Sequence, residues 1–310
     1  MSVPIIDAKD LGHAYGDIVA LHHLDISVPE GRIGLVGANG AGKTTLIKIL
    51  LGILAPTAGT VSVFGCKVGE ETISIRGRVG YMPEGSCLPL SQTAADFTIY
   101  AAELAGIPSR QARQRASDVL TLVGLHEERF RYIGDFSTGM KQRAMLAQAI
   151  VHDPELVFLD EPTAGLDPEG REEMLDLIGR LGGFGINVLV SSHVLTDIER
   201  TCDWVVMLDG GRVLRNGPLS GLTDTGIAEV EVLGEVEAVA AWLEARGAAV
   251  ERNGATLLVR LDGADPFLAV RDALAENGAG MRRLGARSTT LEDIFLEVPA
   301  TSHETSEGPA

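Results

Sequence analysis

Nine consecutive residues, Gly37-Ala38-Asn39-Gly40-Ala41-Gly42-Lys43-Thr44-Thr45, have the composition and spacing of a loop that binds phosphate. They match the pattern G-x-x-x-x-G-K-[ST], in which glycines let successive backbone N–H groups point at phosphate oxygens. Lys43 can reach the β- and γ-phosphates of a nucleotide, and the Thr44 hydroxyl suits a bridging Mg²⁺. An apolar run precedes the loop and a segment of helical character follows it, which is the context that the pattern requires. The loop is therefore predicted to bind nucleotide rather than to serve only as a turn.

A second polar group ends the apolar run from 156 to 159. Asp160 stands where phosphate-loop proteins carry the aspartate that organises Mg²⁺, so we expect it to hold the metal. Glu161 could polarise a water for in-line attack on the γ-phosphate, as a general base does. In isolation, an Asp-Glu pair before Pro162 would only begin a turn, but the phosphate loop upstream favours the metal and base roles.

The bulk composition limits the class of protein. The chain has 310 residues, 45% of them hydrophobic, and a formal net charge of −17, which argues against a generic nucleic-acid binder. Cys66, Cys87 and Cys202 form no C-x-x-C pair, so neither a disulfide framework nor a cysteine metal site is expected. No stretch approaches the ~18 uninterrupted apolar residues of a membrane helix, so service to a membrane would require a partner.

The strands and helices expected around these residues predict an α/β protein. Residues 5–30 predict an antiparallel hairpin with a break at Gly16-Asp17, beside Tyr15. Strands are expected at 60–64, 78–82, 156–159, 187–190 and 204–208, and helices at 94–105, 109–123, 138–152 and 168–181. Strands that alternate with helices predict a mostly parallel sheet, and the three helices between 92 and 153 predict a helical insertion.

A second, smaller unit follows Gly217-Pro218. Its predicted order is strand, helix, strand, strand, helix and strand, which fits a small α+β sandwich. The expected elements are strands at 229–233, 248–251, 256–261 and 281–284 and helices at 235–246 and 266–277. The polar tail from 299 to 310 is predicted to be disordered.

The segment Phe136-Ser137-Thr138-Gly139-Met140-Lys141-Gln142-Arg143 resembles the signature of ABC-type ATPases. It is followed in that family's order by Asp160-Glu161, Gly165-Leu166-Asp167 and Ser191-Ser192-His193, and the resemblance covers residues from about 5 to about 217. It implies a P-loop NTPase core with a mostly parallel sheet, an antiparallel β subdomain and a helical subdomain. The resulting division is an ATPase domain at 1–220 (helical subdomain about 90–153), an accessory α+β domain at 221–298 and the tail.

The resemblance also implies a pair of ATP sites shared between two head-to-tail copies of the chain. In each site Tyr15 would stack on adenine, the loop from Gly37 to Thr45 would hold phosphates and Mg²⁺, and Asp160 would organise the metal. Glu161 would be the base and His193 would contact the γ-phosphate. From the opposite copy Ser137 and Gly139 would close over that phosphate, and Asp167 would bridge the two sites. The implied nucleotide ligands are Tyr15, Gly37, Asn39, Gly40, Ala41, Gly42, Lys43, Thr44, Thr45, Ser137, Gly139 and Asp167; the implied catalytic residues are Lys43, Glu161 and His193.

Two departures from the commonest pattern refine the resemblance. The signature here reads Phe-Ser-Thr-Gly-Met from Phe136, and Glu84 stands where a glutamine usually follows Tyr-x-Pro. Both variants, and the stretch 288–296, look like the ATPase subunits of ABC-2 type exporters, whose membrane helices belong to separate permeases. Glu84 is assigned as a Mg²⁺ ligand or a coupling residue, since a carboxylate can bind Mg²⁺ but cannot donate as an amide does.

The favoured function is therefore the ATP-hydrolysing subunit of an exporter. A homodimer would bind at the cytoplasmic face of the membrane, as a peripheral protein, to two copies of an integral-membrane permease, and no nucleic-acid partner is expected. The alternatives are a soluble ABC ATPase that acts on ribosomes or nucleic acid, and a regulatory or immunity ATPase without a permease. A nucleotide sensor without turnover is disfavoured because Lys43, Asp160, Glu161 and His193 are all present. The sequence does not indicate the cargo.

Overall fold

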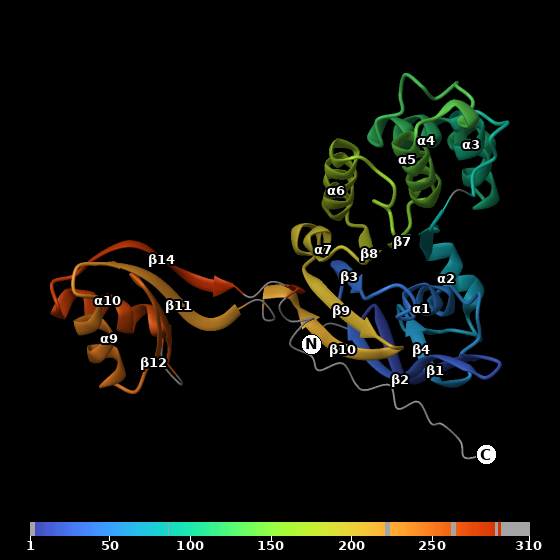
Figure 1. Cartoon of the computed structure of the whole chain (residues 1–310). Helices are drawn as coiled ribbons and strands as arrows, with labels where there is room; N and C mark the ends of the chain where they lie inside the picture. The colour runs from blue at the N-terminus through green and yellow to red at the C-terminus, as the bar shows by residue number, and fades with distance from the viewer. Residues whose placement is uncertain (1–3, 86, 221–223, 262–264, 289–290, 293–310) are drawn as a thin grey trace, which may run out of the picture. The chain divides into compact units, whose positions relative to one another are not determined.

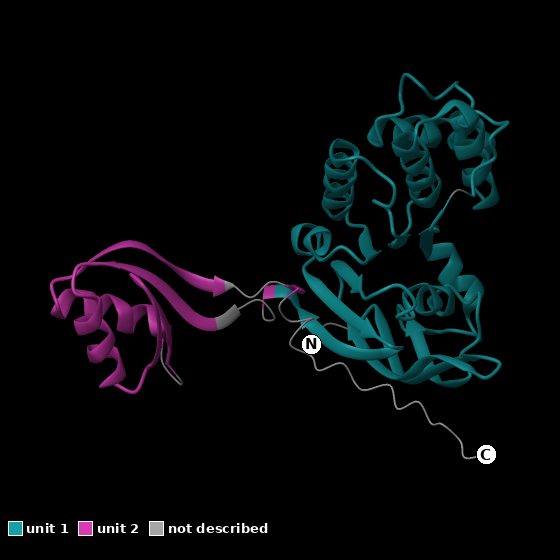
Figure 2. Cartoon of the chain, viewed as in Figure 1, with its two compact units in different colours: residues 1–219 teal, residues 220–310 magenta. Residues whose placement is uncertain are grey.

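The structure is a computed structural model, which describes residues 4–85, 87–220, 224–261, 265–288 and 291–292. Its contacts divide the chain into two compact units, residues 1–219 and residues 220–310 (Figure 2). The predicted tail from 299 to 310, and all of the exporter-like stretch 288–296 except residues 288, 291 and 292, lie outside the described residues.

A six-stranded sheet, ordered β10-β9-β3-β8-β7-β6, forms the centre of the first unit (Figure 1). All neighbouring pairs in it are parallel except β9 and β10. Its strands are β3 (Arg32–Val36), β6 (Val79–Met82), β7 (Leu156–Asp160), β8 (Asn187–Ser192), β9 (Trp204–Asp209) and β10 (Arg212–Pro218). Strands β3, β7 and β8 are almost completely buried, which explains why their sequences are mostly apolar.

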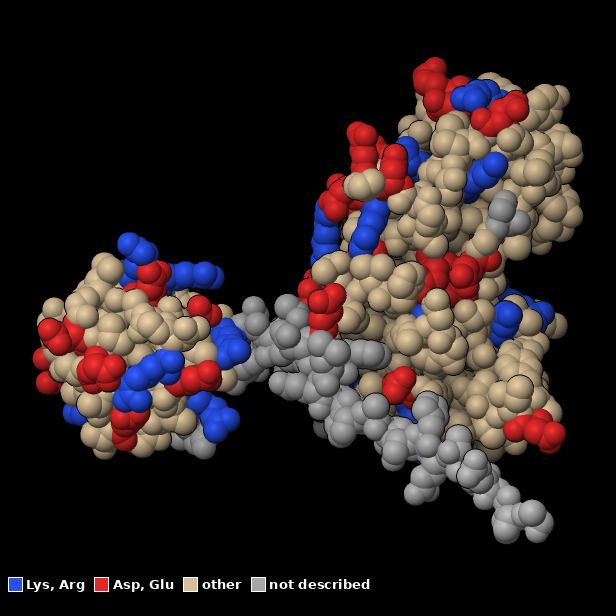
Figure 3. Space-filling model, in the orientation of Figure 1, with Lys and Arg blue, Asp and Glu red and all other residues tan. Residues whose placement is uncertain are grey.

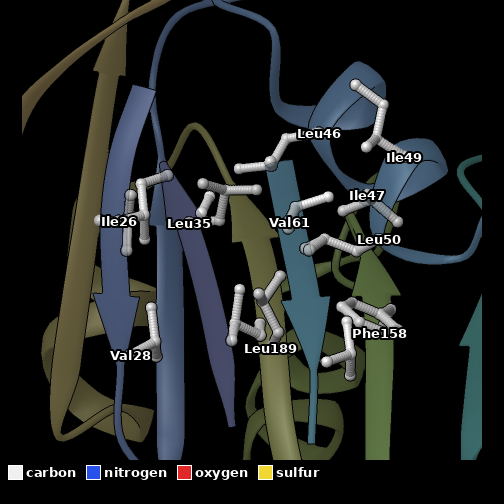
Figure 4. Packing of buried hydrophobic residues seen from close by; sticks show 14 of the residues in the cluster. Ile26, Val28, Leu35, Leu46, Ile47, Ile49, Leu50, Val61, Phe158 and Leu189 are labelled. Carbon is white, nitrogen blue, oxygen red and sulfur yellow. The ribbon is translucent and has the colours of Figure 1, made fainter. Parts of the chain in front are cut away.

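An antiparallel sheet, ordered β2-β1-β4-β5, accompanies the first. Its strands are β1 (Ile6–Tyr15), β2 (Ile18–Val28), β4 (Ala58–Val63) and β5 (Cys66–Lys67), and β1 and β2 form the predicted hairpin. Helix α1 (Lys43–Leu50) contributes its buried side chains to the same core as both sheets. Figure 4 shows Ile47 and Leu50 of α1 near Val61 of β4 and Phe158 of β7. This shared core fixes the helix that follows the glycine-rich loop.

The remaining helices of the first unit include the predicted helical insertion. They are α2 (Thr72–Arg78), α3 (Ala94–Leu104), α4 (Ser109–Leu122), the 3₁₀ turn η1 (Ile133–Asp135), α5 (Thr138–Ile150), α6 (Pro168–Gly183) and α7 (Leu195–Thr201). Helices α3, α4 and α5 pack together (Figure 1). The sequence did not predict α2, α7 or β10, because the two helices are short and β10 ends in Asn-Gly-Pro, which is typical of a turn. Proline is tolerated in β10 because the strand is at the sheet edge.

The second unit has the predicted βαββαβ order. Its elements are β11 (Asp224–Leu233), α9 (Val236–Glu244), β12 (Ala249–Asn253), β13 (Thr256–Arg260), α10 (Pro266–Glu276) and β14 (Gly280–Ser288). The sheet is antiparallel, ordered β12-β13-β11-β14, and both helices contribute to a separate core with Val230, Leu257 and Val259. Among the residues described in either unit, no helix has both the length and the apolar character needed to cross a bilayer.

Gly80 provides a test of how α5 packs on β6. A Cβ atom at Gly80 would lie 1.9 Å from the carbonyl oxygen of Ala149, which is backbone and cannot turn away. We expect Gly80→Ala to lower the free energy of unfolding by about 1–3 kcal/mol, because α5 must shift. The matched control is Gly77→Ala in α2, where a Cβ meets nothing within 4 Å and should stabilise by about 0.5–1 kcal/mol. Denaturant titration measures both, and equal stability of the two variants would contradict the packing.

Candidate active site

The candidate site lies where three neighbouring parallel strands end. Strand β3 leads into the glycine-rich loop, β7 ends at Asp160, and β8 ends at Ser192. Because β8 is hydrogen-bonded to both β3 and β7, the three carboxyl ends meet at one edge of the sheet. This is the edge at which open α/β sheets bind their ligands. Residues far apart in the sequence are thereby brought within hydrogen-bonding distance.

Two glycines allow the loop to take its shape. A Cβ at Gly37 would lie 2.4 Å from the backbone oxygen of Leu208, and Gly42 has a φ of 101°, which side chains disfavour. Gly42 also precedes α1, whose N-terminus has no side-chain cap. The first N–H groups of a helix need partners, and an anion is a suitable one. The geometry of the loop therefore fits phosphate.

Lys43 and Thr44, the first two residues of α1, already contact the other motifs. The Lys43 ammonium donates to the carbonyl oxygens of Gly37 (2.7 Å) and Ala38 (3.4 Å) and lies 3.4 Å from Glu161 Oε1. The Thr44 hydroxyl donates to Asp160 Oδ2 at 3.0 Å. Both residues at the start of α1 are therefore paired with a carboxylate at the end of β7.

Ser191 on β8 holds both carboxylate residues of β7 in place. Its hydroxyl donates to Asp160 Oδ1 and accepts from the backbone N–H of Glu161 at 3.0 Å. Asp160 and Ser191 are both almost completely buried. In the sequence, Ser191 stands out only as part of the motif Ser191-Ser192-His193, and the motif alone gives it no role. Its position at the end of a buried strand was the available signal.

Glu161 occupies a strained and enclosed position. Its φ is 50°, and its N–H is held by the Ser191 hydroxyl and by the Ser191 carbonyl oxygen at 3.2 Å. Oε2 accepts a hydrogen bond from His193 Nδ1 at 2.9 Å, while Oε1 is buried and has no hydrogen-bond partner among the described residues. Lys43 is close enough to Oε1 for an ion pair but is not aligned for a hydrogen bond. An unpaired buried carboxylate oxygen in such a site can accept a proton from a water molecule.

The donor atoms near Thr44 and Asp160 fit Mg²⁺ in kind. A hydroxyl and a carboxylate supply oxygen ligands, which this ion prefers, and phosphate oxygens complete such sites. Glu84 is exposed and, within the part of the chain that the structure describes, makes no hydrogen bond or ion pair with either residue.

Burial, with a smaller contribution from the negative charge of Asp160, raises the pKa of Tyr81 to about 12. The Tyr81 phenol therefore stays neutral near the Asp160 carboxylate.

Tyr15 stands at the end of β1, next to the glycine-rich loop. Its hydroxyl lies 3.4 Å from Thr45 Oγ1, and its ring is about half exposed. The His13 ring meets it edge to face, with ring centroids 4.7 Å apart. His13 is buried, and its Nδ1 bonds to the Ala55 carbonyl oxygen. An exposed aromatic ring at this position is available to stack on a nucleotide base.

Ser137, Gly139 and Asp167 form a separate group. Ser137 caps α5 and Asp167 caps α6, by accepting from the N–H groups of Met140 and Gly170 at 3.3 and 2.9 Å. A groove of about 430 Å³ runs between the two helix starts, and its lining includes no member of the Lys43, Asp160 and His193 group among the described residues. The structure therefore brings the predicted site residues together in two groups rather than one.

Comparisons with known proteins identify the family to which the chain is similar. A family model described as ABC transporter matches residues 21–164. The ABC transporter ATP-binding protein YxlF of Bacillus subtilis, itself described as uncharacterized, is 33% identical over 95% of this chain and 99% of that protein. The Nod factor export ATP-binding protein I of Burkholderia orbicola is 33% identical over 96% of this chain and 98% of that protein. A solved ATP binding subunit of an ABC transporter covers 70% of this chain and 91% of its own, with a TM-score of 0.63 and 30% identity.

Ser191 provides a test of the site geometry. Ser191→Ala removes the hydroxyl that bridges Asp160 and Glu161, and leaves buried polar groups without that partner. We expect the free energy of unfolding to fall by about 1–3 kcal/mol. Mg²⁺-dependent nucleotide hydrolysis should fall more strongly than nucleotide binding. Ser192→Ala is the control, because the Ser192 hydroxyl bonds only to the nearby Val194 N–H in the described structure. A Ser191→Ala variant that hydrolyses nucleotide as fast as Ser192→Ala would refute the bridging role.

Proposed function

Because this chain belongs to the ABC transporter family and is an ATP-binding ATPase of the exporter-type group, we propose that it couples ATP hydrolysis to export through separate membrane permeases. The observation that carries the proposal is the meeting of Lys43, Thr44, Asp160, Glu161 and His193 at one edge of the sheet.

In the proposed reaction, water attacks the γ-phosphorus in line with the bond to the β-phosphate oxygen. Glu161 takes the proton of that water, the bond to ADP breaks, and inorganic phosphate forms. Lys43 and the N–H groups at the start of α1 bind the phosphates and neutralise the charge that spreads over their oxygens. His193 holds Oε2 of Glu161 and contacts the γ-phosphate. Mg²⁺, held by Thr44 and Asp160 when bound, would supply further positive charge to the β- and γ-phosphates.

The separation of the site residues into two groups supports a homodimer. Ser137 accepts a hydrogen bond from its own helix, so its O–H proton is still free to be donated. In the described structure, the groove between Ser137 and Asp167 is not lined by Lys43, Asp160 or His193. We propose that a second copy, arranged head to tail, presents its Ser137 and Gly139 to the γ-phosphate, with Asp167 between the two sites. ATP would close this dimer and hydrolysis would reopen it.

A groove beside β6 is the proposed docking site for the permease. It has a volume of about 880 Å³ and lies between α2 and α3, with Tyr81, Pro83 and Cys87 along one side. Large apolar side chains are exposed around it, including Ile73 (89%) and Leu104 (70%). Exposed apolar side chains gathered around a groove are typical of a surface that another protein covers. Glu84 lies in the sequence between the lining residues Pro83 and Cys87, which supports a coupling role more than metal ligation.

The partner is proposed to be a membrane protein rather than a nucleic acid. The relative from Burkholderia orbicola is named for the export of Nod factor, which favours export here without identifying this chain's cargo. On the face shown in Figure 3, lysine and arginine side chains are interspersed with acidic ones and do not form one basic surface. We therefore place the working dimer on two permease copies at the cytoplasmic face of the membrane.

The proposed base is tested by Glu161→Gln. The substitution keeps the size of the side chain but cannot accept the proton of the attacking water, so hydrolysis should fall by at least about 100-fold. ATP binding should persist, and ATP should hold the chain as a stable dimer, because closure no longer ends in hydrolysis. Steady-state phosphate release, equilibrium ATP binding and light scattering measure the three results. Glu276→Gln, which changes an exposed glutamate of α10 in the second unit, is the control. Unchanged hydrolysis by Glu161→Gln would reject the base assignment.

The native cysteines allow a test of permease docking. Cys87 lines the groove and is exposed, whereas Cys202 is buried and its pKa is raised to about 12, chiefly by burial. In a Cys66→Ser background a maleimide should therefore label Cys87. We expect rapid labelling of the purified chain and slow labelling of the complex isolated from detergent-solubilised membranes.

The complex should contain a stoichiometric polypeptide with several apolar segments of about 20 residues, identified by mass spectrometry. A Cys66→Ser/Cys87→Ser variant gives the background of the labelling. Equal labelling of the free chain and of a complex that does contain such a polypeptide would exclude the groove as the docking site. Failure to isolate any membrane polypeptide would argue against the transport role and leave the ATPase assignment intact.

A further inference from the structure

Asp197 in α7 is a buried carboxylate to which the proposed reaction gives no role. Only about 3% of the residue is exposed, yet it is surrounded by donors from other elements. Oδ2 accepts from the Thr163 hydroxyl at 2.9 Å, and Oδ1 accepts from Arg171 Nε at 2.8 Å and lies 2.6 Å from Arg171 Nη2. Both oxygens of the Asp197 carboxylate thus bond to residues that lie more than 20 positions away in the sequence.

Each of these segments carries a residue of the proposed site. Thr163 follows Glu161 by two residues, and Asp197 follows His193 by four. Arg171 lies in the first turns of α6, the helix that begins after Asp167. One carboxylate therefore connects the backbone of the proposed base, the helix after the γ-phosphate histidine and the helix that faces the second copy.

Helix α7, which carries Asp197, is held against the sheet by packing. Ile198, the next residue, is completely buried against β3, where a Cβ on Gly34 would come within 2.2 Å of its Cγ2. Helix α7 cannot shift without disturbing this packing. The Thr201 hydroxyl also bonds to the Asp197 carbonyl oxygen at 2.6 Å. Through Asp197, the segment that contains Thr163 and helix α6 are therefore both connected to α7, which packs on β3. Strand β3 leads to the phosphate loop.

We propose that Asp197 is a positioning residue, which holds Glu161 and His193 in register and transmits the position of α6 to them. The inference rests on the proposed function, since it assumes that Glu161 is the base. Glu161 accepts from His193 at 2.9 Å, and a small misalignment between a base and its water slows a reaction strongly. Movement of α6 when a second copy docks would reach Glu161 through Arg171, Asp197 and Thr163.

The decisive variants change the link between Thr163 and Asp197 and leave the proposed catalytic residues intact. Thr163→Val removes the hydroxyl at nearly constant volume, and Thr163→Ser restores it. We expect Thr163→Val to lower kcat for ATP about tenfold or more, with KM and ATP affinity close to those of the wild type. The melting temperature should fall by a few degrees, because Asp197 loses one buried hydrogen bond. Thr163→Ser should recover most of the kcat. The double variant Thr163→Val/Asp197→Asn should lose no more kcat than the worse of the two single variants, because both break one interaction.

Arg200 supplies a matched control between the same two helices. It pairs with Glu172 and, at 2.8 Å, with Asp176, so it also joins α7 to α6, but at the surface. Arg200→Gln should change kcat by less than about twofold, since exposed ion pairs contribute little. If Thr163→Val had the same kcat as Thr163→Ser, or if it lowered ATP affinity by the same factor as kcat, the positioning role would be overturned. Wild-type turnover by Glu161→Gln would instead reject the base assignment on which this inference rests, so the two failures are distinguishable.

Discussion

Two adjacent carboxylates, Asp160 and Glu161, are buried at the end of one strand, and much of the first unit serves to accommodate them. Burying a charge is unfavourable unless it is paired and hydrogen-bonded. Asp160 is satisfied by Thr44 from α1 and Ser191 from β8, and Glu161 by His193 after β8, with Lys43 close by. None of these partners is near in sequence. The order β3-β8-β7 is the arrangement that delivers them, because it places the ends of β3 and β7 on either side of β8.

The burial of the carboxylates also explains why the backbone at Glu161 can be strained. A φ of 50° is unfavourable for a glutamate by about 1–3 kcal/mol and persists only where the surroundings impose it. Two acceptors on Ser191 hold the Glu161 N–H, and β7 and β8 are paired up to Asp160 and Ser191. The turn directs the Glu161 side chain away from the strand and toward Lys43 and His193. The strain thus accompanies the geometry that the proposed base requires.

Much of the fold and of the site was predictable from local patterns. The buried strands β7, β8 and β9, the hairpin of β1 and β2 and the βαββαβ order of the second unit each follow from apolar runs and turn residues. Short elements gave no such signal, although the pair Gly210-Gly211, both at positive φ, could have indicated the tight turn between β9 and β10. For the site, motif order selected the candidate residues, but it could not predict how they pair across the sheet. The bridging by Ser191 and the contacts of Asp197 depend on strand order and helix packing, which spacing along the chain does not encode.

The contacts within the site suggest what nucleotide binding must replace. Lys43 donates to carbonyl oxygens of its own loop, and Thr44 donates to Asp160, so both donors are satisfied by the chain itself. Phosphate and Mg²⁺ would exchange these contacts for stronger, charge-assisted ones without leaving a donor unpaired. Glu161 Oε1 differs, because it is buried and no described residue hydrogen-bonds to it. A water molecule next to a bound γ-phosphate would supply that missing hydrogen bond, and it is the proton of this water that the proposed reaction transfers. Under the proposed function, one chain supplies the donors that bind the nucleotide, whereas hydrolysis would also require Ser137 and Gly139 of a second copy.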